Sequence, residues 1–418
     1  MGSGKCSKTC HLGLLVALAA TLVCLLPFLG KAYTIDDTLF LYAAQRIQRE
    51  PFDFYGFGVN WYGFEMPMSQ VTMNPPLGAF YIAWTAAVGG WNEKIMHLAF
   101  LLPALAAIGG CFALAWRLCR HPLAATLAVL ACPAFLVSAT SIMCDVPMLA
   151  LWIWAVVLWI SGMDRNNFLM LTLSSLLVSL AVLTKYFGIC LVPLLFTFSW
   201  TKKGNFSRWP LPLLIPLAVL GLYQWGTHLL YGQAMLSEAA RYATIHRWTR
   251  ETDNLTRLLT GLAFTGGCMA PAFFFAPFLW SRNTLLGLAL SGFIATMVVL
   301  SWGGLGAFQW KQTGGPPWEW LAQFGLWSAG GISILALGWT DWRKNREAES
   351  LLLLLWVAGT FVFTVFVNWT VSARYLLPMT PAVTILLARR LEIRLPALRI
   401  PPRLAWAAPL GLSIVLSL

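Results

Sequence analysis

The sequence predicts an all-α protein that crosses a membrane many times. Of its 418 residues, 59% are hydrophobic and 11% are charged, against about 45–50% and about 25% in soluble domains. Apolar runs long enough to span a bilayer recur along the chain. One water-soluble core cannot bury that much apolar surface, so the fold class is a polytopic helical membrane bundle.

We expect about 11–13 membrane-spanning helices of about 20 residues each, several of them short or interrupted by Gly or Pro. The first run is longer than a signal-peptide core and lacks a clear cleavage site before Tyr33, which favours a retained anchor. In chain order the expected spans are 12–29, 94–118, 122–142, 145–161, 168–183, 186–200, 209–230, 258–280, 284–302, 321–339, 351–368, 374–388 and 404–418.

The charge distribution predicts the orientation of a single membrane domain over 1–418. Most of the 28 lysines and arginines fall in short segments between alternate spans, and the positive-inside rule assigns these segments and the N-terminus to the inner face. Three longer segments, 30–93, 231–257 and 303–320, then face outside. The inner segments are too short for a nucleotide-binding domain, and neither a phosphate-binding loop nor a CxxC pair is present. We therefore expect chemistry on the outer face and no nucleic-acid partner.

Two acids follow the first span directly, at the membrane surface. Thr34 is positioned to cap a helix beginning near Asp36, with Asp37 at its third position; alternatively, one carboxylate is a general base or a metal ligand. Consecutive residues point in different directions, so a cooperating acid must come from elsewhere. The best candidate is Asp145 at the outer start of a span, where an acid is costly unless used. Its other interpretation is a helix N-terminal acid before Pro147.

An aromatic stretch from Phe52 to Phe64, which includes Tyr62, occupies the middle of the first outer loop. It is typical either of an interfacial belt on the lipid headgroups or of a cleft for a sugar or lipid. The loop ends in Asn74, Pro75 and Pro76, which predict a rigid, extended entry into a helical stretch.

Isolated cations mark two further outer junctions. Lys185, between two apolar runs, either extends its ammonium to the surface or holds a phosphate. Arg374 and Tyr375 repeat the pattern later, and outer cations with outer carboxylates suit an anionic lipid headgroup. Four arginines of the 231–257 segment are expected to form a solvated or lipid-phosphate-contacting face: Arg241, Arg247, Arg250 and Arg257.

Taken in order, these features resemble the GT-C superfamily of membrane glycosyltransferases, in the aminoarabinose-transferase and protein-O-mannosyltransferase-like branch. The resemblance covers most of residues 1–390. It rests on the acidic pair after the first span, Pro75-Pro76-Leu77, the acid that opens a later span, a Thr-Lys junction and an Arg-Tyr-x-x-Pro segment. The residue before the double proline, often Lys in the aminoarabinose branch, is Asn74 here.

The resemblance implies transfer of a hexosyl or pentosyl group, with inversion, from a polyprenyl-phosphate-linked donor to a hydroxyl of a lipid, glycan or protein. Asp36 would be the base or acceptor-orienting carboxylate, supported by Asp37 and Asp145. Lys185 and Arg374 would stabilise charge on the departing phosphate. Tyr375, Asn74 and Tyr62 would contact substrate. A divalent metal is the one cofactor left open. Membrane lipids are further partners, and the expected location is a bacterial inner membrane with the site facing the periplasm.

Two other function classes compete with this interpretation. A flippase or scramblase for a lipid-linked glycan would favour ionisable residues near the bilayer midplane and interrupted, repeated helices, whereas the Asp, Glu, Lys and Arg residues here fall in loops or at span ends. A non-catalytic assembly subunit would tolerate loss of Asp36, and an enzyme would not.

Overall fold

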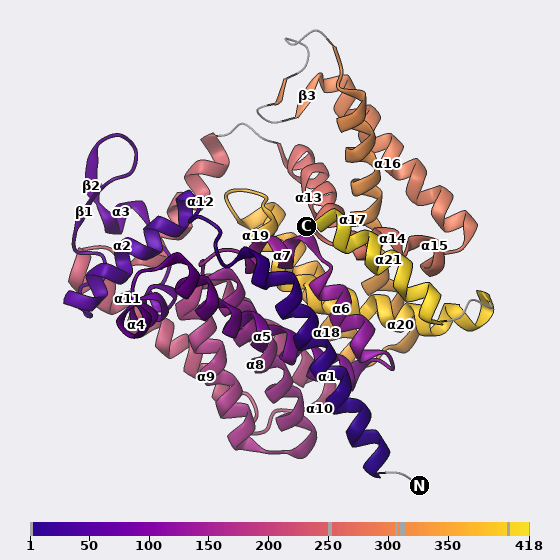
Figure 1. The fold of residues 1–418 in the computed structure, drawn as a ribbon, viewed down its shortest axis with the longest axis horizontal. Helices are drawn as coiled ribbons and strands as arrows, with labels where there is room; N and C mark the ends of the chain where they lie inside the picture. The colour runs from indigo at the N-terminus through magenta and orange to yellow at the C-terminus, as the bar shows by residue number, and fades with distance from the viewer. Residues whose placement is uncertain (1–2, 250–252, 306–307, 310–314, 399–401, 418) are drawn as a thin grey trace. The chain divides into compact units, whose positions relative to one another are not determined.

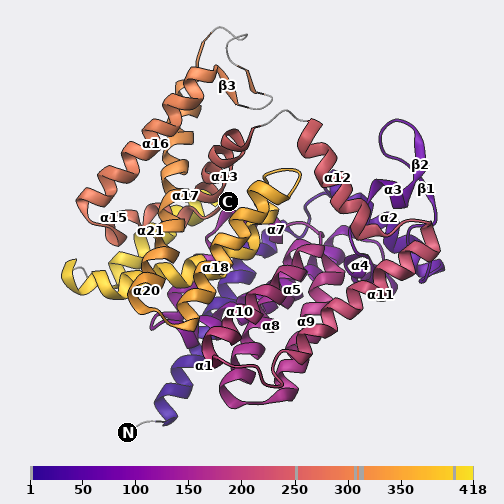
Figure 2. The same ribbon diagram turned by 180° about the vertical axis from the view of Figure 1, so that it is seen from behind.

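The computed structural model describes residues 3–249, 253–305, 308–309, 315–398 and 402–417. Within these ranges the chain is helical apart from two short antiparallel hairpins, which pair β1 with β2 and β3 with β4 (Figures 1 and 2). The predicted all-α membrane architecture is confirmed.

Within the described residues, seven helical segments are long and apolar enough to cross a membrane, and a bent pair makes an eighth if counted as one span. The pair is α6 and α7, Pro122–Leu130 and Pro133–Ala139, with a 61° bend. Each predicted span coincides with helix, but several are shorter or broken, so fewer pass on length alone. Proline accounts for much of this, since it cannot donate the helical hydrogen bond. The seven are Cys10–Phe28, Glu93–Leu118, Asp145–Arg165, Leu211–Tyr231, Arg282–Trp302, Trp318–Asn345 and Ala348–Val367.

The chain divides into two compact units: Met1–Leu114 with Val137–Tyr242, and Ala115–Leu136 with Ala243–Leu418. That they act as a single domain stays a prediction. The elements of the first unit are α1 (Ser3–Leu25), α2 (Ile35–Arg49), β1 (Gly58–Asn60), β2 (Glu65–Pro67), α3 (Met68–Val71), α4 (Leu77–Gly89), most of α5 (Glu93–Leu118), the end of α7, α8 (Asp145–Arg165), α9 (Phe168–Thr184), the 3-10 turn η2 (Tyr186–Cys190), α10 (Leu191–Lys203), α11 (Leu214–Tyr231) and the start of α12 (Met235–Thr249).

The first outer loop folds because α2 is amphipathic. Its buried residues recur at helical spacing, at Phe40, Ala43, Ala44 and Ile47, and this stripe packs on α4. The predicted helix start near Asp36 is confirmed, since α2 begins at Ile35. The loop is therefore a small packed layer that fixes where the first turn of α2 lies.

Below this layer α8 and α9 run side by side in both views (Figures 1 and 2). Polar side chains join the apolar helices: the Ser174 hydroxyl donates to the carbonyl of Ala155, and the Trp159 indole donates to the Ser199 hydroxyl. Such bonds, with small residues, hold helices together where lipid removes the hydrophobic drive for association.

The second unit contains the other helices and the second hairpin. They are α6, α13 (Asn254–Cys268), α14 (Ala270–Phe274), α15 (Ala276–Leu279), α16 (Arg282–Trp302), β3 (Gly304–Leu305), β4 (Phe308–Gln309), α17 (Trp318–Asn345), α18 (Ala348–Val362), the π-helix η5 (Phe363–Val367), α19 (Ala373–Leu376), η6 (Leu377–Met379), α20 (Thr380–Leu398) and α21 (Pro402–Ser417).

Glycine sets the close contact between α13 and α17 in this unit. A Cβ at Gly266 would overlap the carbonyl of Trp327, and one at Gly331 would overlap the carbonyl of Leu262. The two backbones therefore approach as closely as small-residue membrane interfaces allow. Parts of the predicted outer segments 231–257 and 303–320, including Arg250, lie outside the described residues.

Candidate functional site

Asp37 is a fully buried acid whose carboxylate is held by backbone amides. Thr34 is the N-cap of α2, and its backbone N–H donates to Asp37 Oδ2 at 2.7 Å. The backbone N–H of Ile142 donates to Asp37 Oδ1 at 3.3 Å. The capping interpretation is therefore confirmed for Asp37, and the same side chain ties the start of α2 to the segment before α8.

Asp36 occupies the same first turn but differs from its neighbour in exposure. Its side chain is half-buried, whereas Asp37 is 0% exposed. Consecutive helical residues point in different directions, and here one acid enters the protein while the other keeps a partly open face. Of the two, Asp36 is the more exposed carboxylate.

Asp145 and Lys185 form a buried ion pair. Lys185 Nζ lies 2.5 Å from Asp145 Oδ1, and the two side chains are 9% and 1% exposed. Asp145 is the first residue of α8, and Lys185 is the residue between α9 and η2. The predicted extension of Lys185 to the surface is wrong, because the ammonium bonds a carboxylate inside the protein.

The backbone turn at Lys185 depends on one glycine. The N–H of Gly188 donates to the Lys185 carbonyl at 2.9 Å, and a Cβ at Gly188 would lie 2.6 Å from the backbone of Ala181 in α9. Only glycine allows this approach, which holds the chain after Lys185 against α9.

These contacts bring three of the predicted acids and one predicted cation together within the first unit. Ile142, bonded to Asp37, is three residues before Asp145, which is bonded to Lys185. A second hydrogen bond joins the same two segments: Lys31 Nζ, before α2, donates to the Thr140 hydroxyl, before α8, at 2.9 Å. The start of α2 and the start of α8 are therefore fixed to one another by two independent bonds.

Two half-buried tyrosines with buried hydroxyls extend the site from Lys185 towards α11, which the sequence pattern did not indicate. The rings of Tyr186, the residue after Lys185, and Tyr223 of α11 lie 6.2 Å apart. The two hydroxyls interact with one another. Because only one hydroxyl of such a pair can donate to the other, one O–H donor of the pair is left for a polar ligand.

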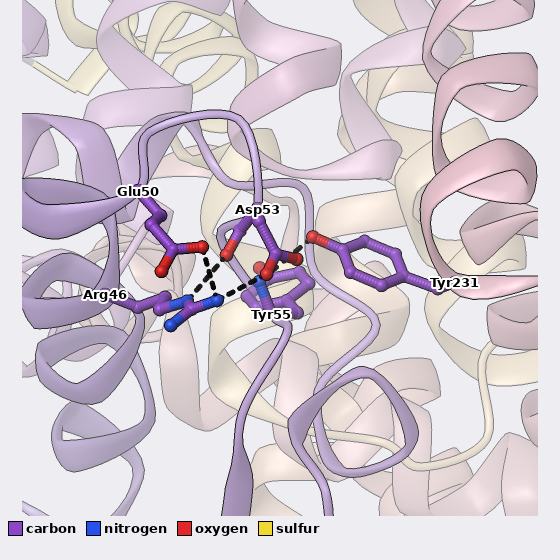
Figure 3. A network of polar contacts seen from close by, with 5 residues as sticks. All are labelled: Arg46, Glu50, Asp53, Tyr55 and Tyr231. Carbon is purple, nitrogen blue, oxygen red and sulfur yellow. Dashed lines mark hydrogen bonds and ion pairs between the residues drawn. The ribbon is translucent and has the colours of Figure 1, made fainter.

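Figure 3 shows a polar network that fixes the loop after α2 and that sequence reasoning also missed. Arg46 donates to Glu50 Oε2 at 2.7 Å and to Asp53 Oδ2 at 2.5 Å, and the Tyr55 N–H donates to the Tyr231 hydroxyl at 3.0 Å. The hydrogen bond with Asp53 raises the pKa of Arg46. The i, i+4 spacing of Arg46 and Glu50 was the one local signal available; the tie to Tyr231 spans 176 residues.

Asn74 joins this loop through its backbone. Its carbonyl accepts a 2.6 Å bond from the buried Tyr55 hydroxyl, and its side-chain amide lies 3.4 Å from the Thr72 hydroxyl. Burial raises the pKa of Tyr55 well above its ordinary value, so the hydroxyl stays a donor. The predicted contact of Asn74 with substrate stays a prediction.

Tyr62 lies in the turn of the β1–β2 hairpin and is 56% exposed. The aromatic stretch divides: Phe54 and Tyr55 are buried in the layer around α2, while Phe52, Tyr62 and Phe64 are exposed. The exposed rings match the interfacial-belt interpretation better than a closed cleft. A role for Tyr62 in substrate binding stays a prediction.

Arg374 and Tyr375 belong to the second unit, in the short helix α19. The Thr364 hydroxyl donates to the Tyr375 carbonyl at 3.1 Å, which attaches α19 to η5. Both side chains are half-buried. The predicted contacts of Arg374 with the donor phosphate and of Tyr375 with substrate stay predictions.

Arg257 is buried, with 6% exposed, contrary to its predicted place on a solvated or lipid-phosphate-contacting face. Its guanidinium donates to the carbonyls of Val365 at 2.7 Å, Asn368 at 2.5 Å and Trp369 at 3.4 Å. These carbonyls lie at and just after the end of η5, where helical carbonyls lack intrahelical partners. The partners are more than a hundred residues away in sequence, so the local pattern held no signal.

The described residues contain no group of three or more His, Cys, Asp or Glu side chains arranged to hold a metal ion. Near Asp36, both oxygens of Asp37 accept backbone N–H groups, and Asp145 is bonded to Lys185. Both of these carboxylates are therefore already bonded to groups of the protein.

Comparison with known proteins supports the resemblance drawn from the sequence. Residues 73–231 match the family described as dolichyl-phosphate-mannose-protein mannosyltransferase. No curated protein sequence matches the chain significantly.

Among solved structures, ArnT from Cupriavidus metallidurans bound to undecaprenyl phosphate matches with a TM-score of 0.56 and 18% identity, over 97% of this chain. An Archaeoglobus fulgidus oligosaccharyltransferase tethered with an acceptor peptide matches with a TM-score of 0.52 and 13% identity, over 98% of this chain. The chain spans 63% and 54% of the lengths of these two proteins. At these identities the likeness is one of fold, and the predicted GT-C fold is confirmed.

Proposed function

We propose that this GT-C-fold chain is a glycosyltransferase that moves a sugar from a polyprenyl-phosphate-linked donor to a hydroxyl group at the outer face of a membrane. The observation that carries the proposal is the connection of the first turn of α2, which bears Asp36, to the buried Asp145–Lys185 pair through Asp37 and Ile142. A partly open carboxylate on a turn that is tied to the segment before a buried ion pair suits the two charges of this reaction: a proton leaving the acceptor and a negative charge growing on the phosphate.

The relatives are consistent with a lipid-phosphate donor. One solved structure of this fold is bound to undecaprenyl phosphate, and the matching family is named for a dolichyl-phosphate sugar. A lipid-linked sugar also suits a chain whose expected inner segments are too short for a nucleotide-binding domain.

The reaction is a direct displacement. Asp36 accepts the proton of the acceptor hydroxyl as its oxygen forms a bond with the anomeric carbon. The bond between that carbon and the phosphate oxygen breaks on the opposite face, and polyprenyl phosphate leaves with the electron pair, so the anomeric configuration inverts. One hydroxyl of the Tyr186–Tyr223 pair donates to an oxygen of the lipid-linked sugar donor.

Asp37, Asp145 and Lys185 take different parts in this scheme. Asp37 is a positioning residue, because both its oxygens are used by backbone amides that orient the turn. Asp145 positions the ammonium of Lys185 through their ion pair, and the positive charge of Lys185 stabilises the departing phosphate. Arg374, Tyr375, Asn74 and Tyr62 are assigned to substrate binding, and the outer face to the periplasmic side of a bacterial inner membrane.

The test is transfer by the purified chain in detergent, with a panel of polyprenyl-phosphate sugars as donors and release of polyprenyl phosphate as the readout. Asp36→Asn keeps the shape of the side chain and removes the base, and we expect it to lower release by about 10²–10⁴-fold. The matched control is Glu65→Gln, the same change at an exposed outer acid of the β1–β2 hairpin, which should release polyprenyl phosphate at the wild-type rate.

Release that is equal in wild type and Asp36→Asn would remove Asp36 from the reaction. Absence of release with every donor, in protein that remains folded, would favour a lipid scramblase or a non-catalytic assembly subunit instead. Lipid scrambling in reconstituted vesicles would then identify a scramblase, and its absence an assembly subunit.

A further inference from the structure

The end of α17 and the middle of α20, both in the second unit, enclose a small hollow with a charged rim. The charged lining residues are Asp341, Lys344 and Arg390; the others are Leu337, Thr340, Leu386 and Ile393. Its enclosed part has room for a group about the size of one water molecule or one phosphate oxygen. By the positive-inside rule, this end of α17 faces the inner side, opposite the expected catalytic face.

The hollow has an excess of positive charge because its one acid is already paired. Arg389 Nη1 lies 3.1 Å from Asp341 Oδ2. Lys344 is exposed, and within the described residues neither Lys344 nor Arg390 has a carboxylate within ion-pair distance. Two cations on the rim are therefore left without an acidic partner among those residues.

A third cation strengthens this excess. Arg394 Nη2 donates to the Trp280 carbonyl at 3.3 Å, while its buried Nε makes no hydrogen bond with any described residue. Arg390 Nε donates to the Leu279 carbonyl at 3.1 Å, and its guanidinium lies 4.9 Å from the centre of the Trp280 ring. Burial and the nearby Arg394 lower the pKa of Arg390, with Asp341 acting in the opposite direction. An anion at the rim would relieve this repulsion.

The position of the hollow favours a lipid over a soluble anion. Lys344 and Arg390 stand where α17 and α20 are expected to leave the inner side of the membrane. Trp339, which is 52% exposed, comes five residues before Lys344 on α17 and so lies on its bilayer side, and tryptophan is enriched at membrane interfaces. Leu337 and Leu386 are each 1% exposed and belong to the packed core beneath the hollow. Cations at the interface match the phosphate of a lipid headgroup.

We propose that this hollow binds the phosphate of an anionic phospholipid in the inner leaflet, with one phosphate oxygen between Lys344 and Arg390. The site is separate from the proposed transfer reaction and holds whether or not that reaction occurs.

The experiment is native mass spectrometry of the full chain in detergent, titrated with phosphatidylglycerol and, separately, with phosphatidylcholine. Lys344→Gln removes a rim charge from an exposed side chain, so folding should be unaffected. The matched control is Arg343→Gln, which removes the same charge from the adjacent exposed residue of α17, outside the hollow. A second variant, Arg390→Lys, keeps the positive charge but loses the guanidinium group and its hydrogen bond to the Leu279 carbonyl.

We expect wild type to retain phosphatidylglycerol in preference to phosphatidylcholine. Lys344→Gln should weaken phosphatidylglycerol binding by roughly fivefold, the equivalent of about 1 kcal/mol for one basic residue near an anionic surface, while Arg343→Gln leaves it unchanged. Equal binding by wild type and Lys344→Gln, or equal loss in both glutamine variants, would overturn the site. Displacement of the lipid by millimolar inorganic phosphate would overturn the assignment to a lipid headgroup in favour of a soluble anion.

Discussion

Lys185 in the first compact unit and Arg257 in the second are both buried cations, with 7% and 6% exposed, yet they are held in different ways. Lys185 places its ammonium 2.5 Å from a carboxylate, Asp145. Arg257 spreads its guanidinium over three backbone carbonyls, one in the π-helix η5 and two just after it. The first arrangement depends on a partner charge, and the second depends on the shape of the side chain.

The difference indicates what each cation is suited to do. An ammonium is a compact charge on a flexible stem, so Lys185 can direct its charge towards a ligand while Asp145 holds it. A guanidinium presents donors in a rigid fork, and Arg257 uses that fork to fasten the backbone. Lys185 is therefore the cation proposed for the chemistry, whereas Arg257 fastens η5 and the residues that follow it.

The largest effect is expected from removing one member of the ion pair. Lys185→Met leaves the Asp145 carboxylate buried without its ammonium, and Asp145→Asn does the reverse, so each should lower the free energy of unfolding by about 3–5 kcal/mol. The double variant removes both charges and should lose less than the sum of the single losses. Equilibrium unfolding in detergent for all four proteins measures the coupling. Additive losses would contradict a direct interaction between the two side chains.

A smaller effect is expected from changing the shape of Arg257 while keeping its charge. Arg257→Lys has one nitrogen where the guanidinium has three, so it cannot reach all three carbonyls, and we expect a loss of about 1–3 kcal/mol. Thermal unfolding in detergent measures it. The control is Arg241→Lys, at an exposed position of α12, which should change stability by no more than about 0.5 kcal/mol. Equal stability of Arg257→Lys and wild type would mean that only the charge matters.

The sequence allowed local features to be predicted and left the long-range ones open. The start of α2 and the capping role of Asp37 follow from Thr34 and the acid three residues later, because a helix N-terminus is a local structure. Asp145 and Lys185 were each selected as costly charges at span ends. Their pairing was not predicted, because it joins positions 40 residues apart through the packing of α8 and α9.

Arg257 was assigned to the wrong environment for the same reason. It follows a polar, arginine-rich stretch that is typical of a solvated face, and its burial depends on the carbonyls of residues 365–369. The buried hydroxyls of Tyr186 and Tyr223 likewise depend on how η2 meets α11. Tertiary contacts decided these positions, while the apolar pattern alone was sufficient for the helices.

The smallest effect concerns Tyr55, which donates to a backbone carbonyl as Arg257 does, but without a charge. Tyr55→Phe keeps the buried ring and removes the 2.6 Å bond to the Asn74 carbonyl, so we expect a loss of about 0.5–1.5 kcal/mol at neutral pH. Because burial raises the pKa of Tyr55 in the folded protein, its contribution is complete below the unfolded tyrosine pKa of about 10 and is lost as pH rises above it. The difference in unfolding free energy between wild type and Tyr55→Phe should therefore shrink from pH 8 to pH 11.

Tyr42→Phe, at an exposed position of α2, is the control and should be neutral at both pH values. A difference that stays constant with pH would mean that the Tyr55 hydroxyl titrates alike in the folded and unfolded chains, and that the tie to Asn74 does not depend on its proton.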